Sequence, residues 1–176
     1  VEKQRAKKRE LPSIEPKVQK IVNSERVEKE KQVTLFETDP NTELPPLALH
    51  DEPEERVQQY SEESLQGMSR LVELKLADFG IEALVKHVHP GPVVTLFEIE
   101  LAAGTKASKV TSLANDLARS MSTISVRVVE NIPGKSYIGL EIPNEQREIV
   151  YLSEVLRSEQ YDKSKSALTV SLGKDI

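Results

Sequence analysis

The stretch HPGPVVTLFEIEL, His89–Leu101, joins a rigid turn to the most hydrophobic strand-like run of the chain. Its Pro-Gly-Pro start suits a tight reversal, because proline fixes φ and glycine frees it. In the run that follows, alternate residues fall on opposite faces of a strand. One face carries Val93, Thr95, Phe97, Ile99 and Leu101, and the other carries Val94, Leu96, Glu98 and Glu100. We expect the first face to be buried and the second to turn toward solvent near its end.

Composition sets limits on the rest of the chain. It has 176 residues, 4% aromatic residues and no cysteine, so we expect a modest core and no disulfide, thiolate zinc site or cysteine nucleophile. Charge is unevenly spread. Residues 1–32 hold ten Lys and Arg against six Asp and Glu, residues 33–63 one against nine, and residues 64–176 thirteen against fourteen.

Targeting signals are missing from the printed sequence. No run approaches the roughly 18 apolar residues of a membrane helix, and no apolar region follows the basic start. We therefore expect a soluble chain without a signal peptide. Because it begins at Val1 and ends at Ile176 without a terminating element, we interpret it as a piece of a longer protein.

Residues 1–60 are charged and interrupted by proline, which predicts a mostly disordered, low-complexity linker. The basic cluster Lys3–Arg9 could contact nucleic acid or acidic lipid, or could simply be a solvated tail.

Order is expected from Ser61, which can cap a helix over Glu62–Phe79 with Gly80 at its C-terminal end. The apolar residues recur at helical spacing: Leu65, Met68, Leu71, Val72, Leu76 and Phe79. Ile81–Val88 is predicted to be a strand that forms an antiparallel hairpin with Val93–Leu101. His87 and His89 share a face of this strand, but two histidines without a third ligand do not make a metal site.

A second helix is predicted over Lys109–Met121, capped by Ser108 after a polar loop. Its stripe is unbroken: Val110, Leu113, Ala114, Leu117, Ala118 and Met121. Off this stripe, Asp116 and Arg119 could pair with each other or contact a partner.

Two further strands complete the pattern. Ile124–Val129 is β-branched on both faces, which favours a place in the middle of the sheet, and Tyr137–Ile142 returns with Ile138, Leu140 and Ile142 inward. Ser153 can cap a brief helix through Arg157, and Leu168–Leu172 starts a new strand. The predicted fold is a two-layer α+β module in the order helix-strand-strand-helix-strand-strand, spanning 61–160, with residues 161–176 as a connection and first strand of a further domain.

Catalytic signatures are absent. Gly134-Lys135-Ser136 imitates the end of a P-loop, but Val129 stands where the first glycine would be and Pro133 removes an amide donor. Glu98 and Glu100 are expected on a solvated strand face, where a general acid/base pair is not the default. We predict no catalytic, cofactor-binding or metal-binding residue in this chain.

The cations of the ordered part are spread singly between acids, without the basic stripe and aromatic platforms of an autonomous nucleic-acid binder. Among them are Lys106, Lys109, Arg119, Arg127 and Lys135. Lys106 and Lys109 are the candidates for residues that face DNA.

Several short motifs occur in a telling order: HPGP, LANDLAR, ISVRV, IPGK, GLEIPN and LSEVL, followed by LGKDI. In this order the sequence from Ser61 to Ile176 resembles the α domain that precedes the RecA-like ATPase domain in the FtsK/SpoIIIE family of bacterial DNA translocases. The resemblance implies a hexameric ring motor that encircles double-stranded DNA and moves it with ATP during chromosome segregation and cell division. It also implies an N-terminal inner-membrane anchor followed by a long linker, with residues 1–60 as the end of that linker.

By the same resemblance, this module is the first tier of the ring, and ATP and magnesium belong to the β domain beyond it. The printed sequence stops before any Walker motif, so we expect this chain alone to lack ATPase activity and to be a cytoplasmic piece of an anchored homo-oligomer. Two other functions remain open: a free-standing α+β adaptor that binds RNA or DNA, and a pure oligomerisation module. Steeply salt-dependent binding would favour the adaptor.

Overall fold

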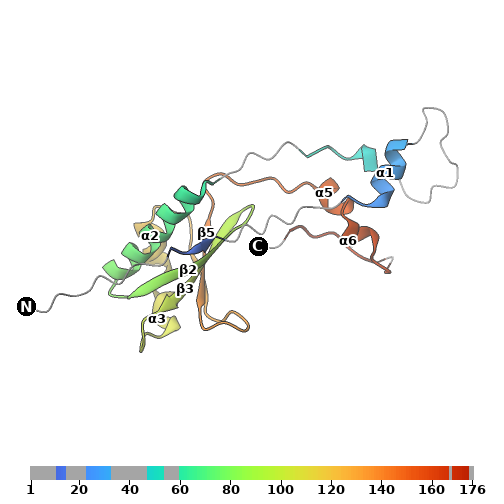
Figure 1. Cartoon of the computed structure of the whole chain (residues 1–176). Helices are drawn as coiled ribbons and strands as arrows, with labels where there is room; N and C mark the ends of the chain where they lie inside the picture. Colours follow the sequence, from blue (N-terminus) through green and yellow to red (C-terminus); the bar gives the residue numbers. More distant parts are fainter. Residues whose placement is uncertain (1–10, 15–22, 33–46, 54–59, 167, 175–176) are drawn as a thin grey trace, which may run out of the picture. The chain divides into compact units, whose positions relative to one another are not determined.

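The computed structural model describes residues 11–14, 23–32, 47–53, 60–166 and 168–174. The described elements are, in chain order, β1 (Ser13–Ile14), α1 (Glu25–Gln32), the 3₁₀ helix η1 (Leu47–Leu49), α2 (Glu62–Asp78), β2 (Ala83–Pro90), β3 (Val94–Leu101), α3 (Ala107–Ser112), α4 (Ala114–Ser120), β4 (Arg127–Val129), β5 (Ile138–Pro143), α5 (Leu152–Leu156) and α6 (Glu159–Asp162). They form two compact units, the first with the sheet and α2–α4, the second with α1, η1, α5 and α6 (Figure 1).

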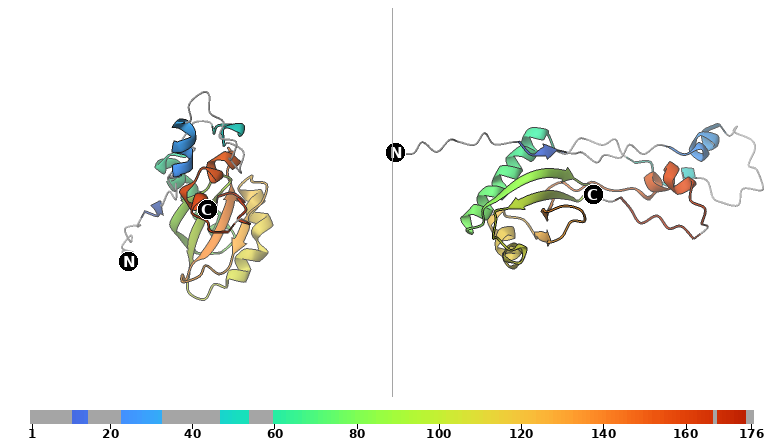
Figure 2. Two further views of the ribbon diagram at one scale, coloured as in Figure 1. Left: turned by 90° about the vertical axis from the view of Figure 1, so that its right-hand side faces the viewer. Right: turned by 60° about the horizontal axis from the view of Figure 1, so that its bottom comes forward.

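The first unit is built on a five-stranded sheet in the order β1-β2-β3-β5-β4. β1 runs parallel to β2, and every other neighbouring pair is antiparallel. β2 and β3 form the long hairpin seen in both views of Figure 2. The predicted α+β class is confirmed.

One face of this sheet makes the core with the helices. The predicted alternation of β3 is confirmed at Thr95, Phe97 and Ile99, which are fully buried. It is wrong at Val93, which precedes β3 and is 40% exposed. The helices and the strands contribute these buried side chains: Leu65, Val72, Leu76, Ile81, Val85, Val88, Phe97, Ile99, Val110, Leu117, Ala118, Val126, Ile138, Leu140 and Ile142.

Helix α2 begins where the sequence predicts. The Ser61 hydroxyl accepts a hydrogen bond from the Ser64 amide at 3.2 Å, and the helix ends at Asp78 before Gly80, whose φ is +67°. The predicted stripe is wrong at Leu71, which is 41% exposed. Ser69 takes the core position instead, because its hydroxyl can donate to the Leu65 carbonyl at 2.8 Å and so enter the core without an unpaired polar atom.

The hairpin carries a β-bulge that the sequence pattern does not reveal. β2 begins at Ala83, two residues later than predicted, and its register to β3 shifts between Val85 and His87. Because Lys86 is the extra residue, both Val85 and Val88 face the core although they are three positions apart.

The second predicted helix is broken in two. The α3 segment ends at Ser112 and α4 starts at Ala114, with Leu113 between them at φ −95° and ψ 2°. The Leu113 amide donates to the Val110 carbonyl at 3.1 Å, a three-residue step that tightens the turn. Lys106, not Ser108, is the N-cap residue, while the predicted apolar face is confirmed by buried Val110, Leu117 and Ala118.

The predicted place of the 124–129 strand is also wrong. Only β4 pairs, and it lies at the edge of the sheet, while Ile124 is 86% exposed. β-branched residues on both faces suit an edge strand as well as an interior one, so composition could not separate the two.

The second unit is held by a few contacts between its early and late segments. The Ser24 amide donates to the Arg157 carbonyl at 2.9 Å, and the Ser153 hydroxyl donates to the Asp51 carbonyl at 2.8 Å. The predicted cap at Ser153 is wrong. Ser153 lies inside α5, and Tyr151 is the N-cap residue. The predicted Leu168–Leu172 strand is wrong, because the described residues 168–174, which contain all of it, form no strand.

The predicted linker falls largely on residues 1–10, 15–22, 33–46 and 54–59, which lie outside the described residues. Its described parts are β1, α1 and η1. No helix among the residues that the structure describes is long and apolar enough to cross a membrane.

Candidate functional site

The second face of the sheet carries a buried ionic cluster centred on Glu98 of β3. The sequence predicts a solvated carboxylate here, yet Glu98 is only 3% exposed. The prediction was wrong because alternation tells which face a residue occupies, not what covers that face. Here the connection between β4 and β5 supplies the cover.

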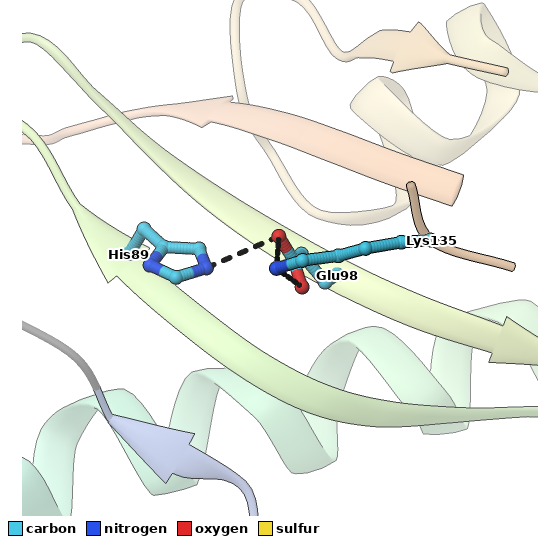
Figure 3. A network of polar contacts seen from close by, with 3 residues as sticks. All are labelled: His89, Glu98 and Lys135. Carbon is cyan, nitrogen blue, oxygen red and sulfur yellow. Dashed lines mark hydrogen bonds and ion pairs between the residues drawn. The ribbon is translucent and has the colours of Figure 1, made fainter. Parts of the chain in front are cut away.

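Lys135 in that connection is the main partner of Glu98. Its Nζ lies 2.7 Å from each carboxylate oxygen, and its side chain remains 39% exposed (Figure 3). On β5, the strand that follows this connection, a side chain at Gly139 would crowd the neighbouring strands β3 and β4. A Cβ at position 139 would lie 2.9 Å from Leu96 Cδ1 and 3.2 Å from Val129 Cβ.

His89 of β2 reaches the same carboxylate from the other side. Its Nε2 lies 3.2 Å from Glu98 Oε1, and its side chain is 5% exposed. His87 stacks on His89 with their ring centroids 6.4 Å apart. The ring centroid of Tyr137 lies 5.9 Å from that of His87. The bulge at Lys86 puts both histidines on this face, which confirms the predicted shared face.

The cluster fixes the charge of Glu98. Burial alone raises the pKa of this carboxyl, but the hydrogen bonds and charge of Lys135, helped by His89 and His87, together lower it below its ordinary value of 4.5. An ionised carboxylate held by two lysine hydrogen bonds is a poor general acid near neutral pH. The arrangement is suited to pinning the β4–β5 connection to the sheet.

Metal binding finds no support in the same place. Among the described residues, no group of three or more His, Cys, Asp or Glu side chains is arranged to hold a metal ion. The His87–His89 pair thus stays part of the ionic cluster.

A second polar feature clamps the turn of the β2–β3 hairpin. Asn144, directly after β5, is 4% exposed; its Nδ2 donates to the Gly91 carbonyl and its Oδ1 accepts from the Thr95 hydroxyl, both at 2.8 Å. The backbone amide of Asn144 also donates to the Val93 carbonyl at 2.9 Å. The sequence pattern alone did not single out Asn144. The available signal was its place after Ile142-Pro143, where a short polar side chain can reach a neighbouring turn.

The Glu98 cluster and the Asn144 contacts lie within a segment that matches a known protein family. A sequence model of the FtsK alpha domain matches residues 44–144. The chain belongs to the FtsK alpha domain family. The predicted resemblance is therefore confirmed for this domain.

Longer relatives of this FtsK alpha domain chain are DNA translocases by name. "DNA translocase FtsK" of Pseudomonas aeruginosa is 56% identical over 154 residues, which is 87% of this chain and 19% of that protein. "DNA translocase FtsK 2" of Ralstonia nicotianae is 49% identical over 177 residues, 100% of this chain and 23% of that protein. "DNA translocase FtsK" of Shewanella oneidensis is 56% identical over 139 residues. The chain spans about a fifth of the length of these relatives.

The two predicted DNA-facing lysines of the FtsK alpha domain lie near one end of the sheet. Lys106 is exposed at the start of α3 and makes no side-chain cap bond. Lys109 is exposed as well, but its Nζ donates to the Gly80 carbonyl at 3.1 Å, where a cation also suits the C-terminal end of α2. Both remain predictions as DNA contacts.

Proposed function

We propose that this chain supplies the α-domain tier of a DNA translocase ring, in which six copies encircle double-stranded DNA. The observation that carries the proposal is the FtsK alpha domain match over residues 44–144, together with relatives at 49–56% identity that are named DNA translocases. Chromosome segregation and cell division are the processes that the family resemblance implies for such a motor. An inner-membrane anchor preceding residue 1 is part of the same proposal.

The charge pattern supports contact between protein subunits more than strong phosphate binding. Several cations of the first unit already pair with acids: Lys86 with Glu100 at 3.0 Å, Arg119 with Asp116 at 2.9 Å, Arg127 with Glu141 at 3.1 Å and Lys135 with Glu98 at 2.7 Å. A protein that grips DNA by itself needs cations free to displace the counterions of several phosphates.

ATP turnover is assigned to a motor domain outside this chain. Lys135, whose place in the sequence imitates a P-loop lysine, forms an ion pair with Glu98. We therefore place ATP and magnesium in the parent motor. This chain contributes shape and DNA-encircling geometry.

Titration of the purified chain with a 30-base-pair duplex over a range of salt concentrations separates this role from that of a free-standing adaptor. We expect weak binding, with Kd above about 1 μM at physiological salt, and a shallow salt dependence. ATP hydrolysis should be undetectable. Nanomolar, steeply salt-dependent binding would replace the proposal with an adaptor, and robust ATP turnover would contradict the assignment of ATP to another domain.

A further inference from the structure

The two-residue strand β1 joins the sheet from far away in the sequence. Ser13 and Ile14 pair in parallel with His87 and Val88 at the outer edge of β2. Pro12 is buried, and Ile14 packs against the hydrophobic core. By contrast, Leu11 is 60% exposed. An extended four-residue segment therefore lies along this edge with only some of its side chains turned inward.

The rest of that edge explains why the segment lies where it does. The Val85 amide donates to Glu73 Oε1 of α2 at 3.0 Å, so it does not donate to β3 and belongs to the outer edge. The bulge at Lys86 follows, and β1 pairs with the two residues after it. An uncovered strand edge invites pairing with other chains, so a helix carboxylate and a short strand here share the task of closing it.

The sequence pattern of the segment occurs twice. Leu11-Pro12-Ser13-Ile14 and Leu44-Pro45-Pro46-Leu47 both read Leu-Pro-x-aliphatic. Residues 44–46 lie outside the described residues, but Leu47 is 6% exposed within the second unit. In both copies the fourth residue is aliphatic: Ile14 packs against the core of the first unit, and Leu47 is buried in the second unit.

We propose that the outer edge of β2, after the Lys86 bulge, is a docking site for the Leu11–Ile14 segment of the same chain. Main-chain pairing supplies attachment, and the contact of Ile14 with the core supplies selectivity, as in recognition by strand addition. Docking closes the edge to a second copy. This role holds whether or not the chain forms a ring.

Hydrogen exchange of the full chain tests the docking. Ile14→Asp puts a charge against the core and should free the segment, raising amide exchange in residues 83–90 by about tenfold or more while β5 stays protected. Leu11→Asp makes the same chemical change at an exposed position of the same segment and should leave exchange in β2 as it is. Equal exchange in the two variants would overturn the proposal.

A spin label distinguishes docking within one chain from exchange between chains. Because the sequence contains no cysteine, Leu11→Cys gives a single labelling site. When the nitroxide and ¹⁵N are on the same chain, diluted with unlabelled chain, the amide signals of residues 86–89 should broaden. When they are on different chains, these signals should stay sharp. Broadening only in the mixed sample would assign the edge to a second copy, and broadening in neither would show that it is not occupied.

Discussion

Glu98 shows how a single charged side chain can organise a loop. Its carboxylate receives two hydrogen bonds from Lys135 and one contact from His89, and these link the β4–β5 connection to the β2–β3 hairpin. The Tyr137 ring packs against His87, whose ring stacks on His89. Since the folded state holds Glu98 ionised, acid should lower the stability of the folded state.

The acid dependence can be assigned to this residue. The pKa of Glu98 is lower in the folded chain than its ordinary 4.5, so its stabilising contribution is complete above pH 4.5 and is lost as the pH falls through the lowered value. Glu98→Gln should flatten this fall in the free energy of unfolding, measured by urea titration at several pH values. The control Glu100→Gln, at a carboxylate that is 47% exposed, should keep the wild-type slope. Identical slopes in all three proteins would refute the assignment.

Phe97 is the largest fully buried side chain of the core. Phe97→Ala should lower the free energy of unfolding by about 3–5 kcal/mol, because the substitution removes apolar contacts and leaves a cavity. Chemical denaturation measures this directly. Leu74→Ala, at a residue that is 59% exposed, should change the value by less than about 0.5 kcal/mol. A melting temperature unchanged by Phe97→Ala would mean that the inward face of β3 is wrongly assigned.

At the scale of elements, the hairpin depends on a polar clamp as well as on its own turn. Asn144 ties the turn to the end of β5 through Gly91 and Thr95. Because Thr95 is buried and Gly91 is half-buried, losing the Asn144 side-chain amide would leave the Thr95 hydroxyl and the Gly91 carbonyl without these bonds.

Asn144→Ala should therefore lower the free energy of unfolding by about 1–3 kcal/mol, the usual cost of stranding buried polar groups. It should also speed amide exchange at residues 91–95 before the rest of the sheet opens. Asn115→Ala, at an exposed position of α4, is the matched control and should do neither. If Asn144→Ala behaves like this control, the turn is held by its prolines and glycine alone.

Periodicity predicted what depends on short-range pattern. The core face of β3, the cap of α2 and the apolar stripe of the second helix follow from residues within a few turns of one another. The edge place of β4 and the burial of Glu98 depend on distant contacts: Lys135 lies 37 positions from Glu98. The bulge at Lys86 likewise needs the register with β3. Such features could not be predicted from local spacing.

At the scale of the whole molecule, the first unit is a domain in which several cations form ion pairs with acids. Polar contacts hold its loops against the sheet, and β1 and Glu73 cover the outer edge of β2. These features fit the structural tier proposed above for this member of the FtsK alpha domain family. A tier of this kind should be exchangeable between related motors when its fold is intact.

The most direct test replaces the matching 154 residues of the Pseudomonas aeruginosa relative with the corresponding part of this chain and measures displacement of a third strand from duplex DNA. The tier role predicts ATP-dependent displacement at a rate within about tenfold of the parent, a difference of about 1.4 kcal/mol in activation free energy. The same chimera with Phe97→Ala should lose activity in proportion to its loss of fold. A folded chimera that hydrolyses ATP but displaces no strand would contradict the proposed role.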